Sequence, residues 1–379
     1  MRTGVSFVIP CLNEERTLER VLQKINKLRS AELRDRPCEV IVVDNGSIDR
    51  SPEIARNCSA RVELCPQKGY GAALKCGIFA ASHPLVIFAD ADDTYDFGES
   101  PKLITEIEKG YDLVLGTRIK GAIQKDAMPL LHRYLGTPAL TGLINILYGG
   151  STAKITDCNS GFRCFSREAF LKWGVHSDGM EFASEMLVKA MLNDAKISEV
   201  PITLHAAFRD RAPHLKTWRD GMRHLLQILL EAPKFFHILG GSIFLVSCVL
   251  LIGTALFRTP VHLGAIALMG IHTASFACIG SFLGLTLWGI GPILTAKRPN
   301  RHVRIYETLV NMPEDRFFWL TIYFLSISLL FVFVVILFWA GYDFKFLPYE
   351  KETVILSGFI TNGILLIFQI FTAHLIKRT

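Results

Sequence analysis

Apolar and polar positions divide the chain into two parts with different patterns. Up to about residue 232, short apolar runs rich in β-branched residues alternate with helical segments of ordinary charge. This alternation predicts an α/β domain whose strands are buried between layers of helices. Beyond that point the chain contains long apolar stretches. Four of them, at residues 236–257, 263–293, 317–341 and 354–375, come near the ~20 residues that a helix needs to cross a bilayer.

The patterns predict three segments. Residues 1–217 form the α/β domain, residues 218–235 an amphipathic helix beside the membrane, and residues 236–379 an all-α domain of four transmembrane helices. Basic side chains surround the leucines of the 218–235 segment, which is typical of a helix on a membrane surface. An ordinary surface helix of the α/β domain has the same pattern. The 263–293 stretch is rich in glycine and holds His272, so its ends are not fixed by the sequence.

The charge pattern adds an orientation in the membrane. The formal net charge is +6, and much of the excess lies beside the apolar stretches, at residues 296–304 and at Lys377-Arg378. The charge therefore does not indicate a nucleic-acid partner. The positive-inside rule places the 294–316 loop and both termini in the cytoplasm. No cleavable signal peptide is expected, and the nine cysteines include no Cys-x-x-Cys pair, which favours free thiols in a reducing compartment.

Two carboxylates follow the predicted strand at residues 84–89. Asp90 and Asp92, separated by Ala91, stand where open α/β sheets bind ligands. Carboxylates are costly to bury unpaired. A divalent cation that carries a diphosphate is a natural partner, because hard cations take carboxylate and phosphate oxygens together. A strand-ending turn with solvated acids is the alternative.

Further polar turns follow other predicted strands in a fixed order. They are Cys11-Leu12-Asn13-Glu14, Asp44-Asn45-Gly46-Ser47, Lys68-Gly69-Tyr70-Gly71, Gly116-Thr117-Arg118 and Asp157-Cys158-Asn159-Ser160-Gly161-Phe162-Arg163. The ordered set resembles family 2 glycosyltransferases of the GT-A fold. Within that family it is most similar to the polyprenyl-phosphate sugar synthases, the group of dolichyl-phosphate mannose synthase and its bacterial relatives. The resemblance covers roughly residues 4–220.

The resemblance implies a GT-A nucleotide-sugar domain, with a Rossmann-like mixed sheet and helices on both faces. It also implies that Asp90 and Asp92 hold Mg²⁺ or Mn²⁺ on the donor diphosphate. Relatives often carry Gln where this chain has Thr94, so the third protein ligand is open between Thr94, Asp93 and Asp96. The implied nucleotide-sugar site consists of Pro10, Asn13, Glu14, Asp44, Asn45, Lys68, Asp90, Ala91 and Asp92.

The acceptor side is implied by basic residues. A lipid phosphate is already ionised at neutral pH, so it needs cations that hold it in line more than it needs a strong base. The resemblance gives this role to Arg118 and Arg133, which with Asp92 would be the catalytic residues. Arg163, Arg211 and Lys216 are implied as further acceptor-binding residues.

Simpler roles remain open for several of these residues. Arg118 and Arg133 are also suited to surface ion pairs. Asn13 and Asn45 are suited to tight turns, in which Asn is common. The family often shows Arg-x-x-Gly-x-Ser-Lys where this chain has residues 209–216, and the central Gly-x-Ser portion is missing. A juxtamembrane basic patch attracted to anionic lipid is the alternative there.

The expected protein is a membrane hexosyltransferase. It would move a hexose from a UDP- or GDP-linked sugar to polyprenyl phosphate by metal-assisted direct displacement. The expected location is a bacterial inner membrane with the catalytic domain in the cytoplasm, and homo-oligomer formation is left open. A processive polysaccharide synthase would carry Gln-x-x-Arg-Trp, which the sequence lacks. A non-catalytic lipid carrier with a degenerate sugar-nucleotide domain is a second alternative, against which the intact Asp90 and Asp92 argue.

Overall fold

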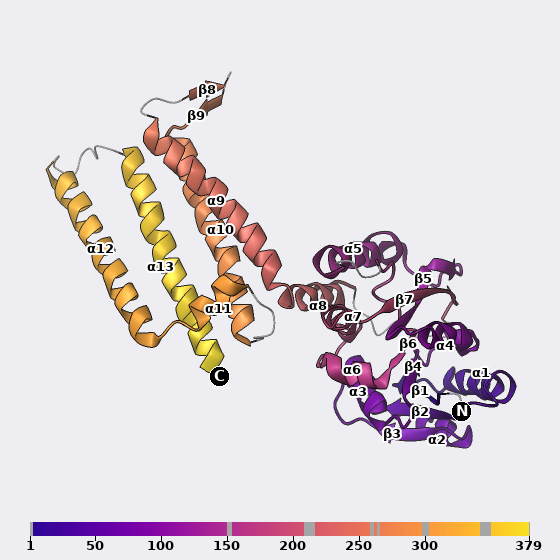
Figure 1. The fold of residues 1–379 in the computed structure, drawn as a ribbon. Helices are drawn as coiled ribbons and strands as arrows, with labels where there is room; N and C mark the ends of the chain where they lie inside the picture. The colour runs from indigo at the N-terminus through magenta and orange to yellow at the C-terminus, as the bar shows by residue number, and fades with distance from the viewer. Residues whose placement is uncertain are drawn as a thin grey trace. The chain divides into compact units, whose positions relative to one another are not determined.

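The chain consists of two compact units, Met1–Ile228 and Leu229–Thr379. The structure, a computed structural model, describes residues 3–149, 154–207, 217–257, 261–263, 266–297, 303–341 and 350–378 (Figure 1). The predicted acceptor residues Arg211 and Lys216 lie outside the described residues.

The first unit is built on a seven-stranded mixed sheet with the order β3-β2-β1-β4-β6-β5-β7. Strand β6 runs antiparallel to both of its neighbours, and the other neighbouring pairs are parallel. The mixed sheet confirms the predicted fold class. The strands are β1 (Val5–Cys11), β2 (Cys38–Asp44), β3 (Arg61–Leu64), β4 (Leu85–Phe88), β5 (Leu113–Ile123), β6 (Arg163–Ser166) and β7 (Ile197–Leu204).

Helices cover both faces of this sheet, because its central strands are apolar on both sides. Alternation along β1 shows the two layers. Val8 packs with α3, α5, α6 and α7, whereas Phe7 and Ile9 pack with α1, α2 and α4 on the other face. The helices are α1 (Leu18–Ala31), α2 (Ser51–Asn57), α3 (Tyr70–Ala80), η1 (Phe97–Glu99), α4 (Ser100–Glu108), η2 (His132–Gly136), α5 (Thr137–Tyr148), α6 (Arg167–Trp173) and α7 (Phe182–Leu192).

The register of the strands brings the predicted polar turns to one edge of the sheet. Cys11 of β1 lies beside Asp44 of β2, and Val8 of β1 lies beside Phe88 of β4. Because these strands are parallel, the segments that leave their carboxyl ends emerge side by side.

Helix α8 (Thr217–Leu230) buries both polar and apolar residues. Its buried face holds Asp220 and His224 together with Ile228, whereas Trp218 and Met222 on the other side are exposed. The division between the units falls after Ile228, so most of α8 lies in the first unit. A break follows α8, and the next helix begins at Pro233.

Among its described residues, the second unit has four helices long and apolar enough to cross a membrane, as the sequence predicts. Helices α9 and α10 approach closely, because a Cβ on Gly240 would collide with the backbone nitrogen of Trp288. The elements are α9 (Pro233–Leu256), β8 (Val261–Leu263), β9 (Ile266–Leu268), α10 (Ile271–Lys297), α11 (Arg304–Val310), α12 (Glu314–Ala340) and α13 (Glu350–Arg378).

The second apolar stretch begins later than the sequence predicts. The expected span covers residues 263–293, but the helix starts at Ile271. The preceding residues form the antiparallel pair β8–β9, in which Val261 lies beside Leu268. Apolar residues with β-branched members fit a short hairpin as well as a helix, so periodicity alone does not separate the two.

Candidate functional site

The carboxylate turn lies directly after β4. Ala91 and Asp92 are buried, and Asp90 is half-buried. The Tyr70 side chain lies close enough to the Asp90 carboxylate to influence the pKa of both groups. Burial, together with the charge of Asp92, raises the pKa of Asp90 to about 7. Full ionisation of both neighbouring carboxylates is therefore unfavourable, and a bound cation would reduce the repulsion between them.

The three candidates for a third metal ligand all have other contacts. Thr94 Oγ1 donates to Asp92 Oδ1 at 2.6 Å. Asp93 takes a left-handed backbone conformation with φ 61° and binds Lys24 Nζ at 2.7 Å. Asp96 caps η1 by accepting from the Gly98 amide at 2.9 Å.

The donor atoms at this turn therefore come from Asp90 and Asp92. Among the described residues, no group of three or more His, Cys, Asp or Glu side chains is placed to hold a metal ion. Two carboxylates that leave several coordination positions to water and phosphate oxygens fit Mg²⁺ or Mn²⁺, which keep such ligands.

The turns after β1 and β2 are joined by hydrogen bonds. Asn13 adopts φ 58°, its Oδ1 accepts from the Ile48 amide at 2.8 Å, and its own amide donates to Ser47 Oγ at 3.0 Å. Asp44 Oδ1 accepts from the Ser47 amide at 2.8 Å. Asn13 thus supports the turn, which is the alternative role that the sequence left open for it. Pro10 and Glu14 are half-buried at the same edge.

Asn45 supports the backbone instead of facing a base. Both of its amide hydrogens are used, because Nδ2 donates to the carbonyls of Cys65 and Gln67. Its Oδ1 accepts from the Gly69 amide at 2.9 Å, where φ is 134°. Lys68 is exposed and donates to the Asn45 carbonyl at 2.9 Å. In this structure all three of these Asn45 amide contacts are to backbone groups, and a contact of Asn45 with the nucleotide stays a prediction.

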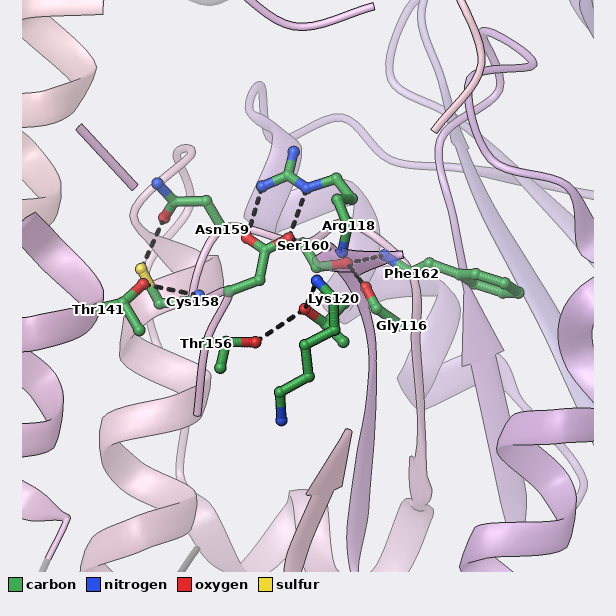
Figure 2. A network of polar contacts seen from close by, with 12 residues as sticks. Gly116, Arg118, Lys120, Thr141, Thr156, Cys158, Asn159, Ser160 and Phe162 are labelled. Carbon is green, nitrogen blue, oxygen red and sulfur yellow. Dashed lines mark hydrogen bonds and ion pairs between the residues drawn. The ribbon is translucent and has the colours of Figure 1, made fainter. Parts of the chain in front are cut away.

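Arg118 forms a paired contact with Asp157. Its Nε and Nη2 donate to the two carboxylate oxygens of Asp157 at 2.7 Å each (Figure 2). Asp157 is fully buried, and the Arg118 side chain is 12% exposed. Figure 2 shows the third guanidinium nitrogen on the side away from these bonds. Arg118 is an ion-pair partner, and it also keeps one edge for another anion.

Arg163 does not lie where an acceptor can reach it. Its side chain is fully buried, and it donates to the backbone carbonyls of Ser160, Ala183 and Cys158 at 3.0, 2.8 and 2.8 Å. Arg163 is therefore not placed to bind the acceptor. Its guanidinium instead holds the loop between Asp157 and β6 in shape.

That loop covers the carboxylate turn. A Cβ on Gly161 would lie 2.9 Å from Asp90 Oδ2, and the Gly161 amide donates to the Tyr95 hydroxyl at 2.9 Å. Sequence reasoning assigned no role to Tyr70 or Tyr95, although both are aromatic residues inside the polar motifs. A tyrosine within a polar motif could have indicated such a role, because a buried hydroxyl needs a hydrogen-bond partner.

Arg133 lies on the π-helical turn η2 and is half-buried. Its guanidinium stacks over the Tyr134 ring at 5.4 Å. The neighbouring His132 has a pKa lowered by burial and by the charge of Arg118, which places η2 within electrostatic reach of that arginine. The charges of Asp92, Arg118 and Glu14 all act on Asp90, so these four side chains lie near one another.

Comparisons with known proteins identify the family. Residues 6–173 match the model of the family described as Glycosyl transferase family 2. The low-salt glycan biosynthesis hexosyltransferase Agl6 of Haloferax volcanii is 36% identical over 294 residues, which are 77% of this chain and 68% of that protein. The dolichyl-phosphate hexose transferase of the same organism is 35% identical over 215 residues, 56% of this chain and 86% of that protein.

A solved structure resembles the chain in fold. Glucosyl-3-phosphoglycerate synthase from Mycobacterium tuberculosis, in complex with phosphoglyceric acid, superposes with a TM-score of 0.50 at 24% identity. The match covers 61% of this chain and 80% of that one. With the mixed sheet, the acidic turn after β4 and these sequence relatives, the chain belongs to glycosyl transferase family 2 and has the GT-A fold.

Proposed function

We propose that the protein transfers a hexose from a UDP- or GDP-linked sugar to polyprenyl phosphate at a membrane surface. The acceptor phosphate oxygen attacks the anomeric carbon while the bond from that carbon to the nucleoside diphosphate breaks. The diphosphate leaves with the bonding electron pair, and the configuration at the carbon inverts. The protein is then a hexosyltransferase whose product is a polyprenyl-phosphate-linked sugar.

The observation that carries the proposal is the pair Asp90 and Asp92 at the end of β4, with Thr94 hydrogen-bonded to Asp92 and Tyr70 beside Asp90. These contacts hold both carboxylates at the edge of the sheet where a donor diphosphate binds. Mg²⁺ or Mn²⁺ bound there would neutralise charge on the leaving diphosphate. Pro10, Glu14 and Asp44 lie at the same edge and are proposed to line the nucleotide.

Arg118 and Arg133 are proposed to hold the acceptor phosphate. The Asp157 carboxylate fixes two nitrogens of Arg118 and so orients the third. A pre-oriented cation suits an ionised nucleophile, because it positions the attacking oxygen without the need for a proton acceptor. Asp157 is engaged with Arg118 in this way and is proposed to orient it.

The membrane features support a lipid acceptor. Four helices are long and apolar enough to span a bilayer. On α8, exposed Trp218, Met222 and Leu226 lie among exposed Arg219 and Arg223. An exposed face that is both apolar and basic suits the surface of an anionic membrane. The name of the dolichyl-phosphate hexose transferase, a relative at 35% identity, agrees with a phosphorylated polyprenol as acceptor.

The test is a panel of radiolabelled nucleotide sugars offered to membranes that contain the protein. Undecaprenyl phosphate is added, and organic-soluble label is measured. One UDP- or GDP-hexose should give a labelled lipid that mild acid releases as free sugar. Labelled lipid that forms without added polyprenyl phosphate in delipidated, reconstituted protein would contradict the acceptor assignment.

The same assay separates an enzyme from a lipid carrier. A carrier with a degenerate sugar-nucleotide domain should release no nucleoside diphosphate from any donor, with or without lipid. The proposed transferase should release it in step with labelled lipid. The Asp92→Ala variant provides the matched background for both measurements.

A further inference from the structure

Helix α8 contacts the rest of the first unit through Thr217, Ile228 and the buried His224. His224 is 5% exposed, and its Nδ1 lies 2.9 Å from Ser184 Oγ. The Ser184 hydroxyl has one hydrogen and donates it to the Glu181 carbonyl at 3.0 Å. It can therefore only accept from the ring, so His224 Nδ1 carries a hydrogen. Burial lowers the pKa of His224 to about 4, so the ring is neutral at neutral pH with its hydrogen on Nδ1.

The segment before Ser184 lies against the start of α3. The Ala72 amide donates to the Asp178 carbonyl at 3.1 Å, and Lys75 Nζ binds the Asp178 carboxylate at 2.6 Å. The approach is close enough to require glycine. A Cβ on Gly69 would collide with the Asp178 carbonyl oxygen, and one on Gly71 would collide with that of Ser177. The position of residues 177–181 therefore fixes the first turn of α3.

That first turn carries Tyr70, which lies between these two glycines and close enough to Asp90 to influence the pKa of its carboxyl. A second connection runs beside it. Arg163 Nη1 donates to the carbonyl of Ala183, the neighbour of Ser184, and the Arg163 charge acts on both Tyr70 and His224. A chain of polar contacts, part buried and part exposed, thus connects α8 with the segment 177–181 and the first turn of α3.

We propose that His224 is a positioning residue for the metal site. It donates from Nδ1 to Ser184, which holds residues 177–181 against α3 and so holds Tyr70 beside Asp90. Because the chain continues from α8 into the first membrane helix, the segment that enters the membrane also sets the geometry of the donor site. This inference rests on the proposed role of Asp90 and Asp92 as metal ligands.

The polar face of α8 is explained by this role. A helix that only covered the domain would bury apolar residues, since unpaired polar groups are costly to bury. Asp220 and His224 are instead buried, and Trp218 and Met222 are exposed. A buried polar network is favourable when its members are paired, and it then specifies one arrangement of the elements that it joins.

Two amide substitutions separate the hydrogen bond from the shape of the ring. The Asn side-chain nitrogen overlays the position of Nδ1, whereas the Gln nitrogen overlays that of Nε2. His224→Asn therefore keeps a donor for Ser184, and His224→Gln removes it at similar volume. Ser184→Ala removes the acceptor, and Met222→Ala is the control on the exposed face of the same helix.

The measurement is Mn²⁺ binding to the full chain in lipid nanodiscs, followed by the electron paramagnetic resonance signal of the free ion. His224→Gln and Ser184→Ala should weaken Mn²⁺ binding about tenfold, the size seen when a group that orients a metal ligand is lost. His224→Asn and Met222→Ala should keep the wild-type affinity. Wild-type affinity in His224→Gln, or equal losses in His224→Asn and His224→Gln, would overturn the assignment.

Asp92→Ala separates this inference from the proposed function. If Asp92→Ala loses Mn²⁺ binding while His224→Gln keeps it, the metal site stands and the positioning role fails. If Asp92→Ala keeps Mn²⁺ binding, the metal site itself is wrong and the positioning role falls with it.

Discussion

The Thr94 hydroxyl donates to Asp92 Oδ1 at 2.6 Å, and the Thr94 amide donates to the same oxygen at 3.2 Å. Both contacts fix one oxygen of the carboxylate and so set the direction of the other. Thr94 therefore occupies the position at which relatives often carry Gln, but it acts on the carboxylate. At that position the chain has a hydroxyl that orients the neighbouring carboxylate.

Replacement of Asp92 should abolish sugar transfer. Loss of a cation that stabilises a diphosphate leaving group raises the barrier by several kcal/mol, so Asp92→Ala should lower transfer at least ~1,000-fold. EDTA should inhibit the wild type in the same radiolabel assay. Asp93→Asn is the matched control, because Asp93 pairs with Lys24 on α1 and should be dispensable for transfer. Undiminished turnover in Asp92→Ala at saturating donor would refute the assignment.

The Arg118–Asp157 pair should matter for stability as well as for transfer. Arg118→Ala leaves the fully buried Asp157 carboxylate without its cation, which should lower the free energy of unfolding by about 3–5 kcal/mol. The double variant Arg118→Leu/Asp157→Asn removes the charge and should recover part of that loss. Thermal unfolding of the three proteins provides the comparison. A double variant that melts below Arg118→Ala would show that burial of the charge is not the cause.

Arg133 offers a cleaner test of the acceptor site, because it is half-buried and stacks on Tyr134. Arg133→Ala should lower transfer about tenfold or more, since a cation that positions the nucleophile is lost. Calorimetry of UDP and GDP with Mn²⁺ should show unchanged nucleotide binding. Lys125, an exposed residue before η2, provides the control Lys125→Ala. If nucleotide affinity falls with transfer, Arg133 belongs to the donor side.

His224 should make the first unit sensitive to acid. Its pKa is about 4 in the folded chain against 6.5 as the ordinary value. Between these values the unfolded chain binds more protons, so stability rises with pH there. The contribution of neutral His224 to the free energy of unfolding is complete above pH 6.5. It is lost as pH falls toward 4, which lowers the free energy of unfolding by roughly 3 kcal/mol.

The measurement is the change in melting temperature between pH 7 and pH 5 in wild type and His224→Asn. The wild type should lose more, because Glu181, Asp220 and Arg163 face the ring in both proteins and only the histidine differs. Equal losses would show that another group dominates the acid response.

The orientation in the membrane can be tested from both sides. The positive charge of the loop before α11 predicts that this loop faces the cytoplasm. A cysteine at Arg304 should react with an impermeant maleimide only from the cytoplasmic side, and one at Glu350 only from the opposite side. Wild type, with its nine native cysteines, gives the background. Labelling of both positions from one side would contradict a four-span topology.

Sequence patterns predicted the sheet and the acidic turn because both depend on local chemistry. Apolar runs such as the one before Asp90 form strands that are buried on both faces, and the acids that follow mark the edge of the sheet. Tertiary partners were not visible in the same way. The Asn45 amide is occupied by carbonyls 20 and 22 residues away along the chain, and Arg163 by carbonyls that include one on α7. No spacing rule reports such contacts.

The amphipathic pattern of α8 was ambiguous for a related reason. Such a pattern shows that a helix has two faces, but not which face meets the protein. Here the buried face holds His224, paired with Ser184, and Trp218 is exposed. That assignment depends on a partner 40 residues away along the chain.

The exposed apolar side of α8 affects the solubility of any fragment that contains this helix without the membrane helices. A fragment that ends at Leu230 would contain the whole mixed sheet and the acidic turn, yet it would present Trp218, Met222 and Leu226 to water. Such a surface adsorbs to micelles, vesicles and air–water boundaries, or to a second copy of itself. A glycosyltransferase domain cut from its membrane helices would therefore need a detergent to stay dispersed. Its purification would call for detergent from the first step.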